Sequence, residues 1–395
     1  MSRMRINRWI IKGSLFLLCL FLPSFRVIGA EQEEKEMSDY IQKAIEEAGI
    51  SFDEMEEALS QSSLKDKISF DEIIKKMWKG ETEEVINRIG TIIKDSLFLE
   101  LSMNRDNFLQ IILLAVFAAL FTNLASGMFS SNLQETGFFT AYLAMTGIML
   151  QSFFLMLSVT KDALYQVFGF MEAFIPAYAI AITVVSGSAS SIAVYEIVFF
   201  LIKGCQWMLK SFILPLIEVY MMIGIVNYVS ETDRFSYMGN LIKDSTHKFL
   251  KWGTGVVLSL NLIQNMILPA VDSVKLGLWQ KGLSAIPGAG DIISAFTGSI
   301  LGASVLIKNS IGAGCLIVLV LLCAVPLIKL IVFVLSFSIC SAFLQPVSDK
   351  RLMGLLHITG ESGRLLIQTL ISCLTLFFIT IALAAVSTNM RFYAG

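Results

Sequence analysis

Charged residues are scarce in this chain: aspartate, glutamate, lysine and arginine make up 16% of its 395 residues, whereas soluble domains carry roughly 25%. The mean hydropathy is +0.71. The few charges are also unevenly spread. Residues 31–107 hold 20 acidic and 10 basic side chains, and residues 108–395 hold only 12 and 15. An ordinary soluble protein is therefore excluded, and the pattern predicts an acidic front joined to a membrane body.

The residues of common catalytic and metal sites are also few. The two histidines, His247 and His357, fall in predicted cytoplasmic loops, and neither has the spacing of a metal site. The six cysteines lie in apolar stretches, which excludes a disulfide scaffold. Gly288-Ala-Gly290 lacks the Lys-Ser/Thr of a phosphate loop. With a formal net charge of −2, the chain does not resemble a nucleic-acid-binding protein. We expect no enzyme, no cofactor, no metal and no nucleic acid.

The first thirty residues have the pattern of a signal peptide. A basic start precedes a short apolar run, 13–22, which Pro23 ends. About ten apolar residues are too few to cross a hydrocarbon core of about 30 Å, and this arrangement is typical of a secretory signal peptide. The alternative is an uncleaved anchor. In both cases the segment that follows is exported.

The acidic front, residues 31–107, predicts short amphipathic helices. Ser-Phe-Asp-Glu occurs at 51–54 and again at 69–72, and each copy fits a capping box, in which Ser and Glu cover free amides at a helix start. Apolar residues at helical spacing follow the second copy. Two interpretations stay open: a small self-packed helical cap, or a docking surface for a partner. Residues 81–100 could also run along the membrane before entering it.

The body, residues 108–387, predicts an all-α polytopic transmembrane bundle of about seven or eight spans, with a short tail at 388–395. Each span needs roughly twenty apolar residues. With the front outside, the basic loops 230–252 and 345–364 are cytoplasmic, and Lys161, Lys203 and Lys210 belong to outer connections. The expected spans are 108–128, 138–159, 164–185, 191–209, 211–229, 253–271, 311–335 and 365–387.

A few ionisable residues lie inside these apolar runs, where such groups normally face a bundle interior or water. Prolines at 176, 215 and 326 are expected to break helices close to three of them. One hypothesis is a polar pathway lined by carboxylates, and the other is a set of interhelical pairs, such as a glutamate with Lys329, that fix packing. The candidate residues are Glu172, Glu196, Glu218 and Lys329.

The glycine-rich stretch 272–310 is a candidate gate or close-packing segment. Small residues four apart let helix backbones approach closely, and irregular backbone at membrane depth occurs only within protein or beside water. A re-entrant element and a surface amphipathic segment are both compatible with it. The candidate residues are Pro287, Gly288, Gly290, Asp291, Gly298 and Gly302.

One continuous block resembles a known family, the stage III sporulation protein AE family. The order of parts also agrees, with a signal peptide, a short exported helical region and then a polytopic body. The segments that carry the resemblance are Val271-Asp-Ser-Val-Lys-Leu-Gly277, Ala285-Ile-Pro-Gly-Ala-Gly-Asp291, Gly302-Ala-Ser-Val-Leu-Ile-Lys-Asn-Ser-Ile-Gly312, Pro326-Leu-Ile-Lys329 and Leu344-Gln-Pro-Val-Ser-Asp349.

The resemblance implies a multi-pass protein of the mother-cell-derived outer forespore membrane, with its N-terminal region extracytoplasmic. It implies a membrane-embedded subunit of a transenvelope, secretion-like channel required for endospore formation. The implied partners are sister membrane proteins of the stage III sporulation A set, including ring-forming subunits and a motor ATPase, together with a forespore-made protein and the lipid bilayer. It implies no catalytic residues. The alternatives are an ion-coupled secondary transporter or permease acting alone, and a passive scaffold.

Overall fold

The computed structural model describes an all-α chain, and its described residues contain no β-strand. The predicted signal peptide, most of the predicted span 108–128 and residues 390–395 of the tail lie outside the described residues. The described residues are 51–62, 64–65, 67–78, 81–103, 109–110, 112–113, 116, 131–186, 190–229, 234–283, 290–345 and 350–389.

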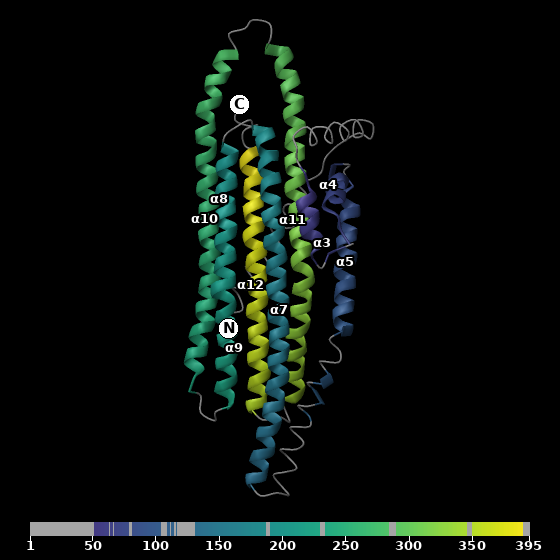
Figure 1. The fold of residues 1–395 in the computed structure, drawn as a ribbon, viewed down its shortest axis with the longest axis vertical. Coiled ribbons are helices and arrows are strands. Elements are labelled where there is room, and N and C mark those ends of the chain that lie inside the picture. The colour runs from purple at the N-terminus through teal and green to yellow at the C-terminus, as the bar shows by residue number, and fades with distance from the viewer. Residues whose placement is uncertain are drawn as a thin grey trace.

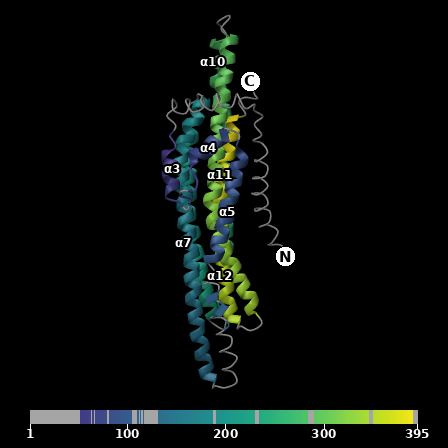
Figure 2. The ribbon, with the colours of Figure 1, turned by 90° about the vertical axis from the view of Figure 1, so that its right-hand side faces the viewer.

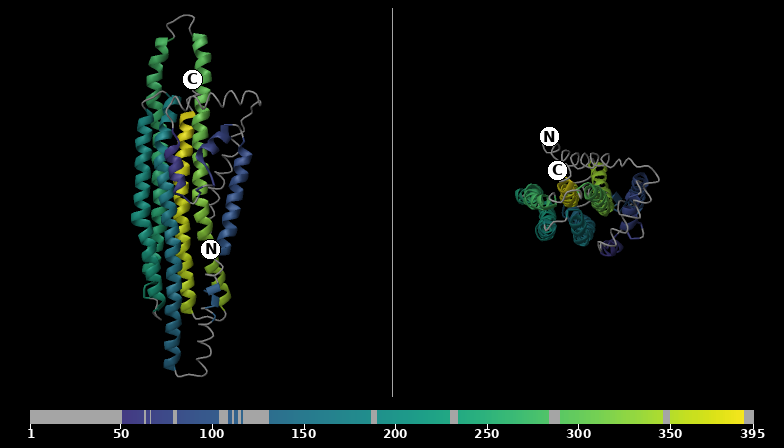
Figure 3. Two further views of the ribbon diagram at one scale, coloured as in Figure 1. Left: turned by 45° about the vertical axis from the view of Figure 1, so that its right-hand side comes forward. Right: turned by 90° about the horizontal axis from the view of Figure 1, so that it is seen from above.

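Long helices form an antiparallel bundle, drawn in Figure 1. At 1.5 Å per residue, α7 with its 56 residues is about 84 Å long. The final helix, α12, contacts α7, α9, α10 and α11, and the view from above places it among them (Figure 3). The bundle elements are α7 (Ser131–Ser186), α8 (Ser190–Met208), the π-helical turn η2 (Leu209–Ile213), α9 (Leu214–Val229), α10 (Ser236–Leu283), α11 (Gly290–Leu344) and α12 (Lys350–Asn389).

Four stretches of the described residues are long and apolar enough to cross a membrane, which confirms the polytopic all-α prediction. The predicted breaks inside them are wrong. Predicted spans 138–159 and 164–185 both lie in α7, and 191–209 and 211–229 form one continuous helix through η2. The lysines expected in connections are Lys161, Lys203 and Lys210. Each contacts a side chain of the neighbouring helix, and the helices continue through all three positions. The stretches are Tyr142–Ala181, Glu196–Tyr228, Asn309–Ala342 and Arg351–Ala382; the total number of spans stays a prediction.

The two basic segments predicted as loops are largely helical, because α10 begins at Ser236 and α12 at Lys350. The residues 230–235 and 345–349 that separate the helices are therefore much shorter than the predicted loops 230–252 and 345–364. The ends of α9 and α11 and the starts of α10 and α12 lie together at one end of the bundle (Figure 1). The two basic segments thus share an end, as the predicted topology requires.

The stretch 272–310 consists mainly of two helix ends, which extend past the rest of the bundle in Figure 1. The part up to Leu283 belongs to α10. α11 begins at Gly290, and Asp291, Gly298 and Gly302 lie within it. Pro287 and Gly288 lie outside the described residues. Whether this stretch is a re-entrant element stays a prediction.

The acidic front packs against the bundle and is not a free-standing cap. Its helices are α3 (Asp53–Ser60), α4 (Phe70–Trp78) and α5 (Thr82–Met103). α4 and α5 contact α11, and α3 contacts α7. α5 runs beside α11 along the length of the bundle (Figure 2), and does not cross it as a helix lying flat on a membrane would. The Phe70 ring meets Phe170 of α7 at 5.9 Å between centroids.

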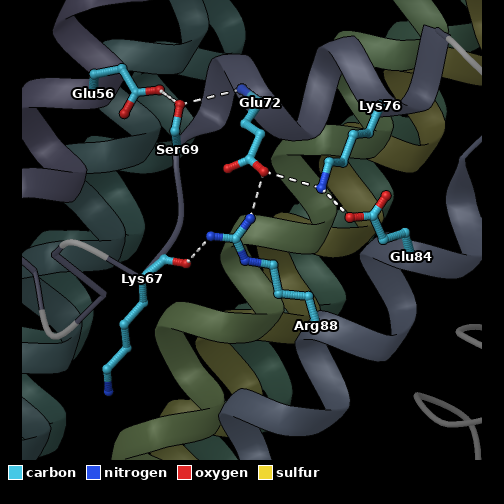
Figure 4. A network of polar contacts seen from close by, with 7 residues as sticks. All are labelled: Glu56, Lys67, Ser69, Glu72, Lys76, Glu84 and Arg88. Carbon is cyan, nitrogen blue, oxygen red and sulfur yellow. Dashed lines mark hydrogen bonds and ion pairs between the residues drawn. The ribbon is translucent and has the colours of Figure 1, made fainter.

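The second predicted capping box is half correct. The Glu72 amide donates to Ser69 Oγ at 3.3 Å, as predicted. The Glu72 side chain turns to Lys76 and Arg88 instead of reaching back. Glu56 of α3 accepts a hydrogen bond from Ser69 Oγ at 2.7 Å instead (Figure 4). It also accepts one from the Asp71 amide at 3.0 Å. This exchange ties α3 to the start of α4.

At the first copy, the amide of Asp53 donates to Ser51 Oγ at 3.1 Å, and the Ser51 hydroxyl donates to the Asp53 carboxylate. The helix begins at Asp53 behind Phe52 without a side-chain cap. The predicted reciprocal capping by Glu54 is wrong here, because the serine bonds two residues ahead and not three.

Candidate functional site

Two ion pairs join α7 to the helix formed by α8, η2 and α9. Lys203 Nζ lies 2.8 Å from Glu172 Oε1, and Lys161 Nζ lies 2.8 Å from Glu218 Oε1. The four side chains are between about one third and one half exposed, so these pairs lie on the outer side of the helix contact. Two of the four predicted site residues are therefore paired across this contact, with lysines that the sequence placed in connections.

A third cation lies between the two pairs. Lys210 Nζ is 5.4 Å from the Tyr165 ring centroid and 6.0 Å from that of Phe168, within cation–π range. The result is a row of three polar contacts along the helix interface, about two helical turns apart. We call it the charged seam, and define it as Lys161, Tyr165 and Glu172 of α7 with Lys203, Lys210 and Glu218 of the facing helix.

The π-helical turn explains why three residues of the facing helix reach one face of α7. Lys203 and Lys210 are seven residues apart, about two α-helical turns, so they share a face. Glu218 follows Lys210 by eight residues, which in a regular α-helix would rotate it away. η2 spans Leu209–Ile213 and absorbs the extra residue, because a π-turn is wider than an α-turn.

Pro215 gives a local cause for this turn. Proline has no amide hydrogen, so it cannot donate to the carbonyl four residues earlier, and η2 ends two residues before it. The prediction that prolines break the helices is wrong, because Pro176 and Pro326 also lie inside continuous helices.

The bilayer cannot be placed on the helix formed by α8, η2 and α9 without including a seam charge. A hydrocarbon core spans roughly twenty helical residues. Every stretch of that length within Glu196–Tyr228 contains Lys210, which lies over the Tyr165 ring of α7. At least part of the seam therefore lies at membrane depth if these helices cross the membrane.

The remaining predicted residues lie elsewhere. Lys329 Nζ of α11 is 3.6 Å from Glu100 Oε1 of α5, so its partner comes from the acidic front and not from the membrane glutamates. Glu196 is exposed at the start of its candidate span. The four predicted residues do not meet in one cluster, and whether they line a pathway stays a hypothesis.

A further charged cluster was missed by the sequence analysis. Glu361 of α12 accepts hydrogen bonds from Lys243 of α10 and from Arg364, and Arg364 also lies 3.5 Å from Ser338 Oγ of α11. The segment 345–364 was interpreted as a loop, so its acidic residue was not considered as a group inside the bundle. A helix start at Lys350 would have placed Glu361 three turns into an apolar helix.

The acidic front carries its own network, drawn in Figure 4. Lys76 Nζ lies between Glu72 and Glu84, at 3.1 Å and 2.6 Å, and Arg88 donates to Glu72 Oε1 at 2.6 Å. Arg88 also donates to the Lys67 carbonyl at 3.0 Å. The Lys76 ammonium, followed by the Arg88 guanidinium, holds the pKa of Glu72 below its usual value of 4.5. The network therefore joins α4 to α5 beside α11.

Comparison with known proteins gives two matches and one negative result. The model of a family described as stage III sporulation protein AE matches residues 68–388. The stage III sporulation protein AE of Bacillus subtilis (strain 168) is 21% identical over 296 residues, which cover 74% of each chain. No solved structure matches this chain.

Proposed function

Because the chain belongs to the stage III sporulation protein AE family, we propose that it is the membrane-embedded subunit of a transenvelope channel between mother cell and forespore. In this proposal it lies in the mother-cell-derived outer forespore membrane, with residues 31–107 outside the cytoplasm. Its partners are sister stage III sporulation A-set proteins, among them ring-forming subunits and a motor ATPase, and a forespore-made protein.

One observation carries the proposal beyond membership of the family. Charged side chains run along the outer side of two candidate spans, where lipid would be a costly neighbour. A bundle that worked alone would be expected to keep such groups in its interior. The charged seam therefore favours a subunit that works within an assembly over one surrounded by lipid.

The proposal is tested in a spore-forming host that carries this chain with an affinity tag. Deleting the gene should abolish spore formation, and restoring the tagged chain should recover it. Membrane proteins of the A set should co-purify with the tag from sporulating cells after mild cross-linking. Normal spore numbers without the gene would refute the sporulation role. Purification of the tagged chain without any A-set protein would refute the assembly.

The alternative, an ion-coupled transporter acting alone, has its own readout. The purified chain in liposomes would then take up a small solute, and Glu218→Gln would abolish the uptake. We expect no uptake above that of protein-free liposomes, because the channel proposal requires other subunits.

A further inference from the structure

The charged seam differs from two exposed apolar stripes on other helices of the bundle. On α10, the exposed side chains Trp252, Val256 and Leu260 recur every four residues and are all apolar. On α11, Ile331, Leu335 and Ile339 form a similar exposed apolar stripe. These stripes are what lipid tails require. The seam instead exposes lysines and glutamates.

Each seam glutamate already has a lysine partner inside the chain, so no partner of opposite charge is needed to neutralise it. The exposed portions of these groups still need hydrogen bonds. In a hydrocarbon core such bonds are absent, and a charged side chain there costs a few kcal/mol even by the lower scales. Water supplies these bonds, and a seam facing water has no such cost.

We propose that the charged seam faces water inside the membrane and forms one wall of a hydrophilic passage for water and small hydrated ions. The inference rests on the proposed function in one respect, since another subunit of the assembly must form the opposite wall. Lys161, Lys203 and Lys210 stand beside Glu172 and Glu218, so the wall carries both signs of charge. Tyr165 lies at its centre and is 63% exposed.

The height of the seam can be matched on another face. A Cβ placed on Gly253 of α10 would come within 2.5 Å of Met208 Cε, so Gly253 lies level with the residues just before Lys210. Val256 is less than one turn further along α10 and is 55% exposed. Because α10 is antiparallel to the helix of α8, η2 and α9 (Figure 1), Val256 lies about five residues, or about 8 Å, from the level of Lys210 and Tyr165, well within a hydrocarbon core of about 30 Å. Tyr165 and Val256 are comparable in exposure, and they differ in whether their surroundings are charged or apolar.

The test is thiol labelling in host membranes opened to both sides. Tyr165→Cys and Val256→Cys are each made in the full chain, and the probe is a membrane-impermeant trimethylammonium methanethiosulfonate. The five described cysteines, Cys205, Cys315, Cys323, Cys340 and Cys373, are all buried, so the unaltered chain gives the background. Tyr165→Cys should react at least about tenfold faster than Val256→Cys, because only the thiolate reacts and apolar surroundings suppress it.

Two outcomes would overturn the inference. Equally fast labelling would mean that this whole level of the bundle lies outside the hydrocarbon core, and equally slow labelling would mean that lipid or protein covers the seam.

If Tyr165→Cys fails to accumulate, Trp207→Cys replaces it, since Trp207 lies on the seam side between Lys203 and Lys210 and is 62% exposed. Slow seam labelling in a strain that still needs the chain for spores refutes the passage alone. Fast labelling in a host that forms spores without the chain refutes the proposed function alone.

Discussion

Replacing Glu361 by alanine tests the charged cluster that joins α10 to α12. The Glu361 side chain is 12% exposed and carries two cationic partners, Lys243 and Arg364. Removing the carboxylate leaves the Lys243 ammonium partly buried without its counter-charge. Breaking a fully buried pair in this way costs about 3 to 5 kcal/mol. Because Lys243 keeps some contact with solvent, we expect about 2 to 3 kcal/mol here.

Arg364→Ala is the matched control. Arg364 belongs to the same cluster but is 54% exposed and lies three residues from Glu361 on the same helix. Pairs three or four residues apart on a helix surface contribute about 0.2 to 0.5 kcal/mol. The two single variants should therefore differ clearly in stability although each removes one charge from one cluster.

The measurement is equilibrium unfolding of the purified full chain in mixed micelles with increasing denaturing detergent. For Glu361→Ala, 2 to 3 kcal/mol corresponds to about a 30- to 140-fold change in the unfolding equilibrium constant. The double variant Lys243→Ala with Glu361→Ala should be more stable than Glu361→Ala alone, because the stranded cation is gone. Equal stability of Glu361→Ala and Arg364→Ala, or strict additivity in the double variant, would refute the reasoning.

Three further predictions follow from contacts described above. Gly314→Val should release the acidic front from α11 and expose residues 51–103 to protease, because a Cβ at Gly314 would lie 2.4 Å from Ile74 Cδ1. Gly147→Val is the control and should leave digestion unchanged, because a Cβ at Gly147 would meet no atom within 4 Å. Glu72, whose pKa is lowered, stabilises the α4–α5 contact above pH 4.5, and this contribution is lost as the pH falls through its lowered pKa. The sensitivity of the acidic front to protease should therefore rise on acidification. Glu72→Gln should remove this pH dependence. Exchanging Lys161 and Glu218 for one another should preserve spore formation while Lys161→Glu alone lowers it, and an exchange as harmful as the single change would show that their pairing is not what matters.

The all-α fold and the membrane character were predictable because they depend on composition and on apolar run length. Glu172, Glu218 and Lys329 were also recognisable, since an ionisable group in an apolar run is conspicuous in any sequence. Their partners were not. Lys161 falls between two predicted spans and Lys203 lies towards the end of one, and only the structure of the neighbouring helix shows which glutamate each lysine meets.

Other features depend on contacts between residues far apart in the chain. The π-helical turn aligns Glu218 with Lys203, yet the spacing alone places Glu218 on a different face. Lys329 pairs with Glu100 across more than two hundred residues, because α5 packs beside α11. Glu361 was missed for a simpler reason, a helix start placed too late in the sequence.

The central position of α12 has a consequence for biosynthesis. The ribosome completes α7 to α11 before α12 exists, yet α12 contacts α7, α9, α10 and α11. Until it arrives, the earlier helices contact one another but lack every contact with α12, and the Glu361 carboxylate that accepts from Lys243 is missing. Quality-control proteases of the membrane should therefore degrade a chain truncated before Lys350 rapidly, while the full chain persists.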